Sequence, residues 1–310
     1  MTTSLVTGAG GFIGSNLVRE LLERGHTVRG LDNFQTGRRE NLEGVTAEAF
    51  DLYERDLADG NLDDVLEGVD YVFHQAAVPS VPRSIDDPQL SVEANCTGTT
   101  NLLIAARDAG VERVVVASSS SVYGSSATLP KREDQPINPE SPYALTKYFT
   151  EELAMEFAEF YDLDTVALRY FNVFGPHQDP TSDYAAVIPK FARMMLDGEQ
   201  PTIHGDGEQS RDFTYIENVL QANVKAATTE VGGEVYNVAC GGRVTINELV
   251  DALNDVLETS LEGIHTEPRA GDVKHSHADI SKAREEIGYE PTVEFREGLE
   301  RTVAAIEADG

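Results

Sequence analysis

The apolar residues of the N-terminal half alternate between short continuous runs and longer helical patterns. The short runs predict buried strands at residues 4–7, 27–31, 49–53, 71–74 and 113–117. Helical patterns lie between them, including one that extends to about Arg24 and one from Ser91 to Ala109. Strands that alternate with helices in this way predict an α/β fold with a doubly wound parallel sheet.

A glycine-rich turn joins the first predicted strand to the first helix. Gly8, Gly11 and Gly14 follow a G-x-x-G-x-x-G spacing, which differs from the commoner G-x-G-x-x-G. Glycines let the backbone approach a pyrophosphate, and the helix N-terminus supplies amide donors and a partial positive charge. Because tight turns also need glycine, this pattern alone is weak evidence for a dinucleotide site.

Asp32 strengthens that prediction, because it ends the second strand eighteen residues after Gly14. An acid near this position binds the adenosine ribose hydroxyls of NAD. Arg38 and Arg39 lie nearby and keep NADP as a minority alternative. Asp56 is predicted either to hold the adenine amino group or to cap a helix, and the residues alone do not separate the two.

A run of serines follows the strand that ends at Ala117. In a doubly wound sheet, ligands bind beyond the carboxyl ends of the strands, so the hydroxyls of Ser118 to Ser121 are expected to face the same crevice as the glycine turn. A serine run is more often a flexible loop. Its place at a strand end makes it a candidate for proton transfer.

A second long helical pattern, residues 142–161, carries Tyr143 and Lys147 one turn apart on the same face. A phenol has a pKa of about 10, and a nearby ammonium lowers that pKa by about 1 to 3 units. Tyr143 could then accept and return a hydroxyl proton. Chance produces this spacing on many helices, so the prediction depends on the glycine turn, Asp32 and the serine run.

The charge of the chain is strongly negative. Its 310 residues include 54 Asp and Glu against 24 Lys and Arg, for a net charge of -30. Such a surface repels nucleic acids and anionic membranes, and its acidic residues are interleaved with apolar periodicity as in a folded protein. We hypothesise that the acidic surface reflects adaptation to high salt.

No apolar run reaches the length of a membrane span, and the N-terminus carries no basic segment, so we expect a cytoplasmic protein. Cys96 and Cys240 show no metal-ligand spacing and are expected to be buried, reduced thiols. His275 and His277 are expected to lie on the surface, and no metal site is predicted.

Together, the glycine turn, Asp32, Ser119, Tyr143 and Lys147 resemble the extended short-chain dehydrogenase/reductase family. The segments His74–Ala77, Ser80–Ser84 and Arg169–Pro176 are similar to UDP-hexose 4-epimerases, and within them to the UDP-N-acetylglucosamine 4-epimerase branch. Gly205–Phe213 and Arg269–Asp272 strengthen the resemblance, which covers nearly the whole chain.

The resemblance implies a Rossmann-type NAD-binding domain, residues 1–170 plus about 217–240, and a smaller substrate domain, about 171–216 plus 241–310. It implies Ser119, Tyr143 and Lys147 as catalytic residues. The cofactor contacts that it implies are Gly8, Gly11, Phe12, Ile13, Gly14, Asp32, Asn33, Asp56, Leu57, Gln75, Ala76, Ala77, Asn95, Tyr143, Lys147 and Tyr170. The substrate contacts that it implies are Ser80, Arg83, Ser84, Ser120, Ser121, Tyr143, Asn172, Val187, Arg211, Arg269, Asp272 and Ser276.

The implied reaction is a transient oxidation of a UDP-sugar. Tyr143, with Ser119, removes the proton of the 4-hydroxyl while NAD takes the C4 hydride. The 4-keto sugar then swings about its diphosphate link and takes the hydride back on its other face. Lys147 holds the nicotinamide ribose and lowers the pKa of the phenol. Lowering that pKa from about 10 to about 7 needs roughly 4 kcal/mol of differential stabilisation, which Lys147 and the positive nicotinamide of the cofactor are expected to supply together.

The diphosphate is expected to bind Arg211 and Arg269, whose forked donors suit phosphate oxygens. Asp272 would accept from the nucleoside ribose. A surface ion pair is the alternative for each arginine, and it is natural in so acidic a protein.

Two positions separate the related enzymes. Related dehydratases and decarboxylases carry a glutamate two residues before the strand-end tyrosine, whereas this chain has Ser121 there, which favours epimerisation. Ser276, seven residues after Arg269, is small and leaves room for an N-acetyl group. UDP-glucuronate epimerase or decarboxylase activity, and a non-catalytic NAD-binding sensor, remain the alternatives.

The long helical patterns 91–109 and 142–161 also carry surplus apolar residues. The apolar positions of the second pattern include Leu145, Phe149, Leu153, Phe157 and Phe160. As in the family, they suggest a homodimer through a four-helix bundle.

High salt should stabilise the protein, because screening weakens repulsion among the surplus carboxylates. Thermal unfolding across a potassium chloride series is expected to show a melting temperature that rises with salt. Equal or greater stability at low salt would contradict the hypothesis of salt adaptation.

Overall fold

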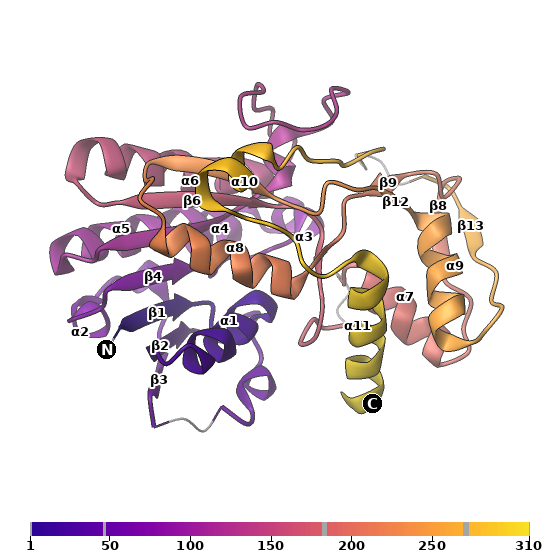
Figure 1. Ribbon diagram of the computed structural model, residues 1–310, viewed down its shortest axis with the longest axis horizontal. Helices are drawn as coiled ribbons and strands as arrows, with labels where there is room; N and C mark the ends of the chain where they lie inside the picture. Colours follow the sequence, from indigo (N-terminus) through magenta and orange to yellow (C-terminus); the bar gives the residue numbers. More distant parts are fainter. Residues whose placement is uncertain (1, 46–47, 182–184, 269–272, 310) are drawn as a thin grey trace.

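The computed structural model describes residues 2–45, 48–181, 185–268 and 273–309. Its large sheet has seven parallel strands in the order β11-β6-β5-β4-β1-β2-β3 (Figure 1). Their bounds are β1 Thr3–Thr7, β2 Thr27–Asp32, β3 Phe50–Glu54, β4 Tyr71–His74, β5 Arg113–Ser119, β6 Thr165–Tyr170 and β11 Glu234–Val238. The predicted α/β fold with a doubly wound parallel sheet is confirmed. Chain order reverses between β1 and β4, which is where such sheets bind ligands.

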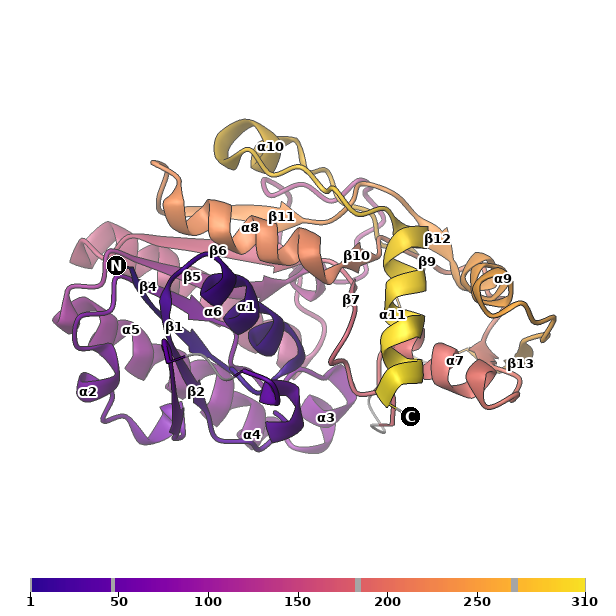
Figure 2. The same ribbon diagram turned by 60° about the horizontal axis from the view of Figure 1, so that its bottom comes forward.

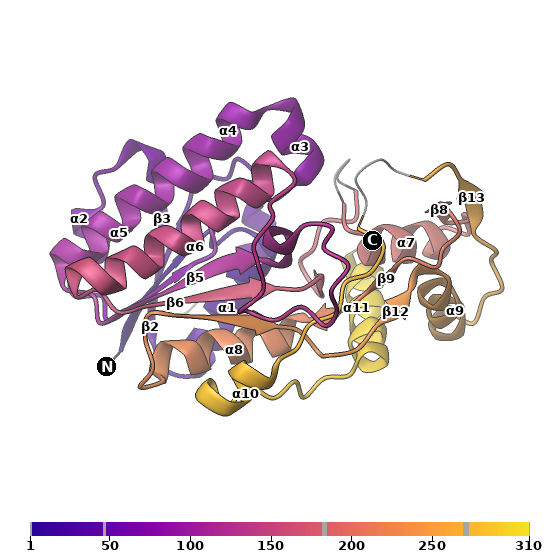
Figure 3. The ribbon, with the colours of Figure 1, turned by 90° about the horizontal axis from the view of Figure 1, so that it is seen from above.

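Helices cover both faces of this sheet. Helices α1 (Phe12–Glu23) and α8 (Ile216–Thr228) pack together on one face (Figure 2), and α2 (Asp63–Leu66), α5 (Gly98–Ala109) and α6 (Pro142–Tyr161) lie on the other. Figure 3 shows α5 and α6 side by side. Buried Val and Leu side chains of β1, β4, β5 and β6 fill the space between the layers, as expected for strands covered on both faces.

The helix expected at residues 91–109 begins earlier and is interrupted. Helices α3 (Val81–Asp86) and α4 (Pro88–Val92) lead into a π-helical turn at Glu93–Thr97 before α5. Asn95 lies in that turn and is 1% exposed. Its side chain accepts from the Val78 N–H at 2.7 Å and donates to Thr146 Oγ1 at 2.9 Å, so the turn ties two neighbouring segments together.

A smaller lobe follows β6. It contains α7 (Val187–Leu196), α9 (Ile246–Leu257) and α11 (Phe295–Asp309), with α10 (Ser281–Ile287) beside β11. Its two-stranded sheets pair β7 (Val173–Phe174) with β10 (Thr214–Tyr215), β8 (Thr202–His204) with β13 (Ile264–Thr266), and β9 (Ser210–Arg211) with β12 (Val244–Thr245). Helix α8 and strand β11 then return to the large sheet, and the division into two domains stays a prediction.

A buried ion pair joins α6 to the sheet. Arg169 on β6 donates to both carboxylate oxygens of Glu151, at 2.9 and 2.5 Å, and the two side chains are 4% and 0% exposed. Ser118 on β5 donates to the same carboxylate at 2.7 Å. Arg169 also donates to the Tyr123 hydroxyl at 2.7 Å, so this network holds α6, β5 and β6 in one register.

The serine run is ordered, and one expectation about α6 was wrong. Ser118 and Ser119 form the end of β5, where both pair with residues of β6, and Ser120–Tyr123 form a 3-10 helix. Phe157 is 5% exposed and points from α6 into a core cluster shared with α5, so it is unavailable to a dimer surface. Among the described residues, no helix is long and apolar enough to cross a membrane.

Candidate active site

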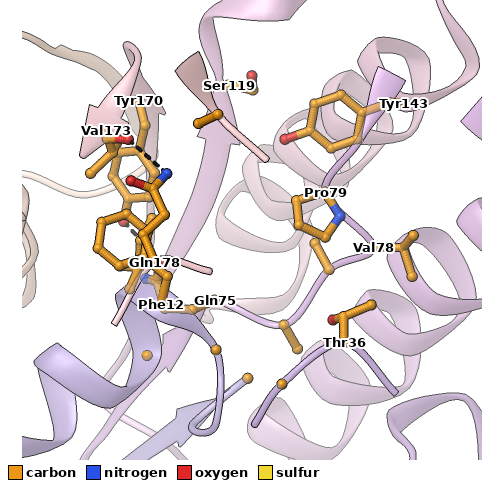
Figure 4. Close-up of a pocket in the computed structure, with 18 of the residues that line it drawn as sticks. Phe12, Thr36, Gln75, Val78, Pro79, Ser119, Tyr143, Tyr170, Val173 and Gln178 are labelled. Atoms are coloured by element: carbon orange, nitrogen blue, oxygen red, sulfur yellow. Dashed lines mark hydrogen bonds between the residues drawn. The ribbon is translucent and has the colours of Figure 1, made fainter. Parts of the chain in front are cut away.

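A cleft of about 840 Å³ lies at the carboxyl ends of the strands. One wall is built from the glycine turn and the segments that follow β2, β4 and β5, and the other comes from residues 170–179 and the small lobe. Figure 4 shows Tyr143 across the cleft from Tyr170, Val173 and Gln178, with Ser119 nearby. The predicted location of the ligand site therefore coincides with this cleft.

The glycine turn has no space for side chains. Gly8 has φ +69°, and a Cβ there would lie 2.8 Å from the Ala76 backbone. At Gly14 a Cβ would lie 2.0 Å from the Gly8 carbonyl oxygen. Gly11 caps α1 without a side-chain hydrogen bond, and the first turn of α1 has no acidic residue. Its amide groups therefore remain available to an anion, which fits the pyrophosphate of a dinucleotide.

Asp32 shapes the turn as well as facing the cleft. It is 6% exposed, and its carboxylate accepts from the backbone N–H groups of Gly10 at 2.8 Å and Phe34 at 2.7 Å. Burial raises the pKa of Asp32, while these two hydrogen bonds and the nearby Arg39 lower it. Sequence reasoning assigned Asp32 a ligand, but its second task, holding the glycine turn, required the structure.

Asp56 caps a short helix, which is one of its two alternatives, and it also lines the cleft, while the contact to adenine stays a prediction. Its Oδ1 accepts from the Ala58 N–H at 2.8 Å and so caps the 3-10 helix Leu57–Asp59. Its Oδ2 accepts from Asn33 Nδ2 at 2.7 Å, and both side chains line the cleft beside Leu57. A further 3-10 helix, Arg39–Leu42, completes this end of the wall.

The start of α6 positions the tyrosine. Ser141 caps the helix by accepting from the Ala144 N–H at 3.1 Å, and Pro142 occupies the first helical turn. Ser84 Oγ accepts from the Tyr143 N–H at 3.0 Å. These contacts hold the phenol toward Ser119, whose Oγ accepts from the Ser121 hydroxyl at 2.9 Å.

The pKa values of Tyr143 and Lys147 both depart from their ordinary values. Burial raises the pKa of Tyr143, a hydrogen bond with Ser119 lowers it, and Lys147 is not among the causes. Burial lowers the pKa of Lys147 to about 8, although Cys96 and Glu151 counteract part of that shift. In the protein without ligands, desolvation dominates the pKa of both groups, and the lowering of the phenol pKa by Lys147 together with the nicotinamide of NAD stays a prediction.

Lys147 is 4% exposed, and within the described residues its ammonium makes no hydrogen bond or ion pair. A buried ammonium normally needs such partners. Its three donors would suit the hydroxyls of a ribose, so the pair of Lys147 and the open glycine turn fits NAD.

Most predicted site residues do line the cleft. Those that do are Gly8, Gly11, Phe12, Ile13, Gly14, Asp32, Asn33, Asp56, Leu57, Gln75, Ala76, Ala77, Arg83, Ser119, Ser120, Ser121, Tyr143, Tyr170, Asn172, Arg211 and Ser276. Arg269 and Asp272 lie outside the described residues. On the substrate side, Asn172 Nδ2 donates to the Asp212 carbonyl at 3.2 Å and to Ser276 Oγ at 3.4 Å, which brings two predicted contacts together.

Five predicted contacts do not line the cleft, and each instead supports it or lies beside it. Ser80 caps α3 by accepting from the Arg83 N–H at 3.2 Å. Ser84 is fully buried and holds the Tyr143 backbone, and Asn95 holds the π-helical turn. Val187 begins α7 behind Ala186, which does face the cleft, and Lys147 sits beneath the surface of the wall.

The sequence did not reveal several loop residues that complete the cleft. These include Thr36, Gly37, Asn41, Val78, Pro79, Lys131, His177, Gln178, Asp179 and His275, together with Arg38, which the sequence linked only to an NADP alternative. Arg38 approaches Asp179 at 3.7 Å, and Asn41 donates to the His177 carbonyl at 3.3 Å, so these loops bridge the two walls. No periodic pattern marks them, because tertiary contacts alone bring them together.

The remaining expectations concern His275, the two cysteines and a metal site. His275 was expected on the surface but lines the cleft, where its Nδ1 pairs with Ser210 Oγ at 2.9 Å. Cys96 and Cys240 are free, as expected, but half-buried. In the described part of the chain, no group of three or more His, Cys, Asp or Glu residues is arranged to hold a metal ion.

Comparison with known proteins decides the family. Residues 4–239 match the NAD dependent epimerase/dehydratase family. The chain belongs to this family. It is 40% identical over 304 residues to the UDP-glucose 4-epimerase of Mycolicibacterium smegmatis. The matched region covers 97% of each chain. NAD is its cofactor, and the predicted enzyme class, an NAD-dependent UDP-sugar 4-epimerase, is confirmed.

Solved structures agree over the whole chain. The UDP-N-acetylglucosamine 4-epimerase of Methanobrevibacter ruminantium M1, in complex with UDP-N-acetylmuramic acid, is 42% identical with a TM-score of 0.96 and covers 100% of this chain and 99% of its own. The UDP-glucuronic acid 4-epimerase of Bacillus cereus, in complex with UDP-glucuronic acid and NAD, is 33% identical with a TM-score of 0.93 and covers all of both chains. Epimerases named for different sugars thus share this fold, so the fold does not identify the sugar.

Replacing Tyr143 by phenylalanine should separate cofactor binding from catalysis. The Tyr143→Phe variant should keep bound NAD, because the glycine turn and Asp32 are intact, and lose roughly 10²- to 10⁴-fold in turnover with the proton-transfer group. Absorbance and release of the bound dinucleotide would measure NAD binding, and a coupled epimerase assay would measure turnover. Near-normal turnover would refute the role assigned to Tyr143.

Proposed function

We propose that this epimerase interconverts UDP-N-acetylglucosamine and UDP-N-acetylgalactosamine, and also accepts UDP-glucose and UDP-galactose. The observation that most supports this proposal is the small side chain of Ser276. It lines the cleft, and its Oγ lies 3.4 Å from Asn172 Nδ2. A larger residue there would occupy space that a 2-acetamido group needs. The similarity to the M. ruminantium enzyme supports the same choice.

In this proposal Tyr143 and Ser119 handle the proton. The Tyr143 hydroxyl takes the proton of the sugar's 4-hydroxyl and later returns it, and Ser119 positions the same hydroxyl from the end of β5. Bound NAD supplies the hydride acceptor at C4. Lys147 binds ribose hydroxyls of the dinucleotide and brings a positive charge near the phenol, because its pKa of about 8 leaves it mostly protonated at neutral pH.

Arg211 is the diphosphate ligand that the described residues offer. It lines the cleft from β9, and its Nη1 donates to the Ser210 carbonyl at 3.0 Å, which orients the guanidinium. Guanidinium groups bind phosphate oxygens through paired donors. Arg269 and Asp272 keep their proposed roles toward the diphosphate and the nucleoside ribose.

The alternatives are less consistent with the cleft. A decarboxylase or dehydratase would need a carboxyl group at the position of Ser121, and the hydroxyl there instead hydrogen bonds to Ser119. A non-catalytic NAD sensor would have no use for a tyrosine turned toward Ser119 and a buried lysine one turn later. Turnover of a UDP-sugar by the purified protein separates the enzyme from the sensor.

A homodimer through α5 and α6 is the second part of the proposal. Leu145, Phe149 and Phe160 on α6 are 57%, 41% and 65% exposed, and Ile104 on the adjacent α5 is 40% exposed. Figure 3 shows these two helices side by side on one face of the sheet. An apolar face of this kind is typical of a helical interface between copies.

Replacing Phe149 by glutamate should therefore produce a monomer, because a charge on this face opposes its burial. Sedimentation equilibrium should give the mass of a dimer for the wild type and of a monomer for Phe149→Glu. Ile264→Glu, at an equally exposed apolar residue of the small lobe, is the matched control and should stay dimeric. A monomeric wild type would sink the proposed interface.

Ser276→Tyr should block the acetylated sugars selectively. The phenol would occupy the room beside Asn172, so kcat/KM on UDP-N-acetylglucosamine should fall roughly tenfold or more while UDP-glucose is nearly unaffected. Ser276→Ala, which keeps the room open, serves as the control. Turnover by the wild type only on unacetylated or uronic sugars would overturn the proposed specificity.

A further inference from the structure

Lys131 is a buried cation in the wall of the cleft. It follows Pro130 in the segment between β5 and α6, is 3% exposed, and lines the cleft with Ser121 and Gly124. Its Nζ donates to the Ser126 carbonyl at 2.5 Å. The Nζ also lies over the Tyr123 ring, 5.9 Å from its centroid. The bond to Ser126 is its only side-chain hydrogen bond to another described residue, and it uses one of the three donors that an ammonium carries.

No carboxylate in the described part of the chain lies within ion-pair distance of this ammonium. Burial lowers the pKa of Lys131, and the more distant Glu140 raises it. Glu140 itself accepts from Ser125 and Asn138. The Tyr123 ring face compensates part of the cost of burying this charge. Two of the donors still have no oxygen acceptor among the described residues, so a ligand in the cleft can supply one.

The backbone of Lys131 pairs with the segment that follows Ser276. The Lys131 N–H donates to the His277 carbonyl at 2.7 Å, and its carbonyl accepts from the Asp279 N–H at 2.8 Å. Lys131 thereby forms a parallel bridge with Ala278, two residues beyond Ser276. The cation and the small side chain therefore belong to one paired segment of the same wall.

We propose that Lys131 is a specificity-determining residue whose ammonium donates a hydrogen bond to the carbonyl oxygen of the sugar's 2-acetamido group. This inference rests on the proposed function and deepens it. Ser276 leaves room for the acyl group, and Lys131 supplies the polar contact that makes filling this room favourable. Lys131 takes no part in proton or hydride transfer.

A neutral acceptor fits this position better than a sugar carboxylate does. Glu140 already acts on the ammonium through space, and the chain carries a net charge of -30, so the surrounding potential does not favour a further anion. A carbonyl oxygen accepts from an ammonium without adding charge.

Steady-state kinetics of full-length holoenzyme variants on two UDP-sugars test the proposal. Lys131→Met keeps the length of the side chain and the backbone bridge but removes the donors. Its kcat/KM on UDP-N-acetylglucosamine should fall about 10- to 100-fold, as for a lost charged hydrogen bond, with less than about a threefold change on UDP-glucose. Lys131→Gln, which retains a neutral donor, should recover part of the loss. Lys190→Met, at an exposed lysine of α7, controls for the lost charge.

The outcomes separate the two hypotheses. If the wild type converts the acetylated pair and Lys131→Met weakens both sugars equally, or neither, the specificity role of Lys131 is wrong and the proposed function stands. If the wild type converts neither acetylated sugar, the proposed function fails and the acetamido contact fails with it. A wild type that converts UDP-glucuronate, with that activity lost in Lys131→Met, would assign the ammonium to a carboxylate and overturn the proposal.

Discussion

The buried pair of Glu151 and Arg169 is the contact on which the active site depends. It binds the middle of α6 to β6, and Ser118 joins it from β5. Glu151 lies one turn beyond Lys147 and two turns beyond Tyr143, so the register of this pair also sets where the phenol meets Ser119. Removing one partner of such a pair leaves a buried charge and typically costs about 3–5 kcal/mol, which makes alternative registers of α6 unfavourable.

Desolvation governs the charges of Tyr143 and Lys147, the proposed catalytic pair. It raises the pKa of Tyr143 and lowers that of Lys147 to about 8, so burial disfavours the charged form of each group. The isolated protein thus holds a neutral phenol at neutral pH. A lower phenol pKa must come from charges that join the cleft with the ligands, which couples the reactivity of Tyr143 to their binding.

A buried carboxylate that does not line the cleft organises the wall proposed to bind substrate. Asp212 is 1% exposed and accepts from the backbone N–H groups of Cys240, Gly241 and Ala278. Burial outweighs the opposing effect of these hydrogen bonds and raises the pKa of Asp212 to about 6. Through its neighbour Arg211 and the segment that contains Ser276, Asp212 holds together the parts of the wall that the proposed function assigns to diphosphate and sugar.

The amino-acid sequence alone determined the α/β fold, the glycine turn, Asp32 and the pair of Tyr143 and Lys147, because local periodicity and short spacings encode each of them. The structure alone showed that Ser84 and Asn95 support the site from beneath, and that Lys131 and His275 face the cleft. Those placements depend on pairing between segments far apart in the chain, such as the bridge between Lys131 and Ala278. No spacing records such a contact, since it exists only after the two lobes have packed together.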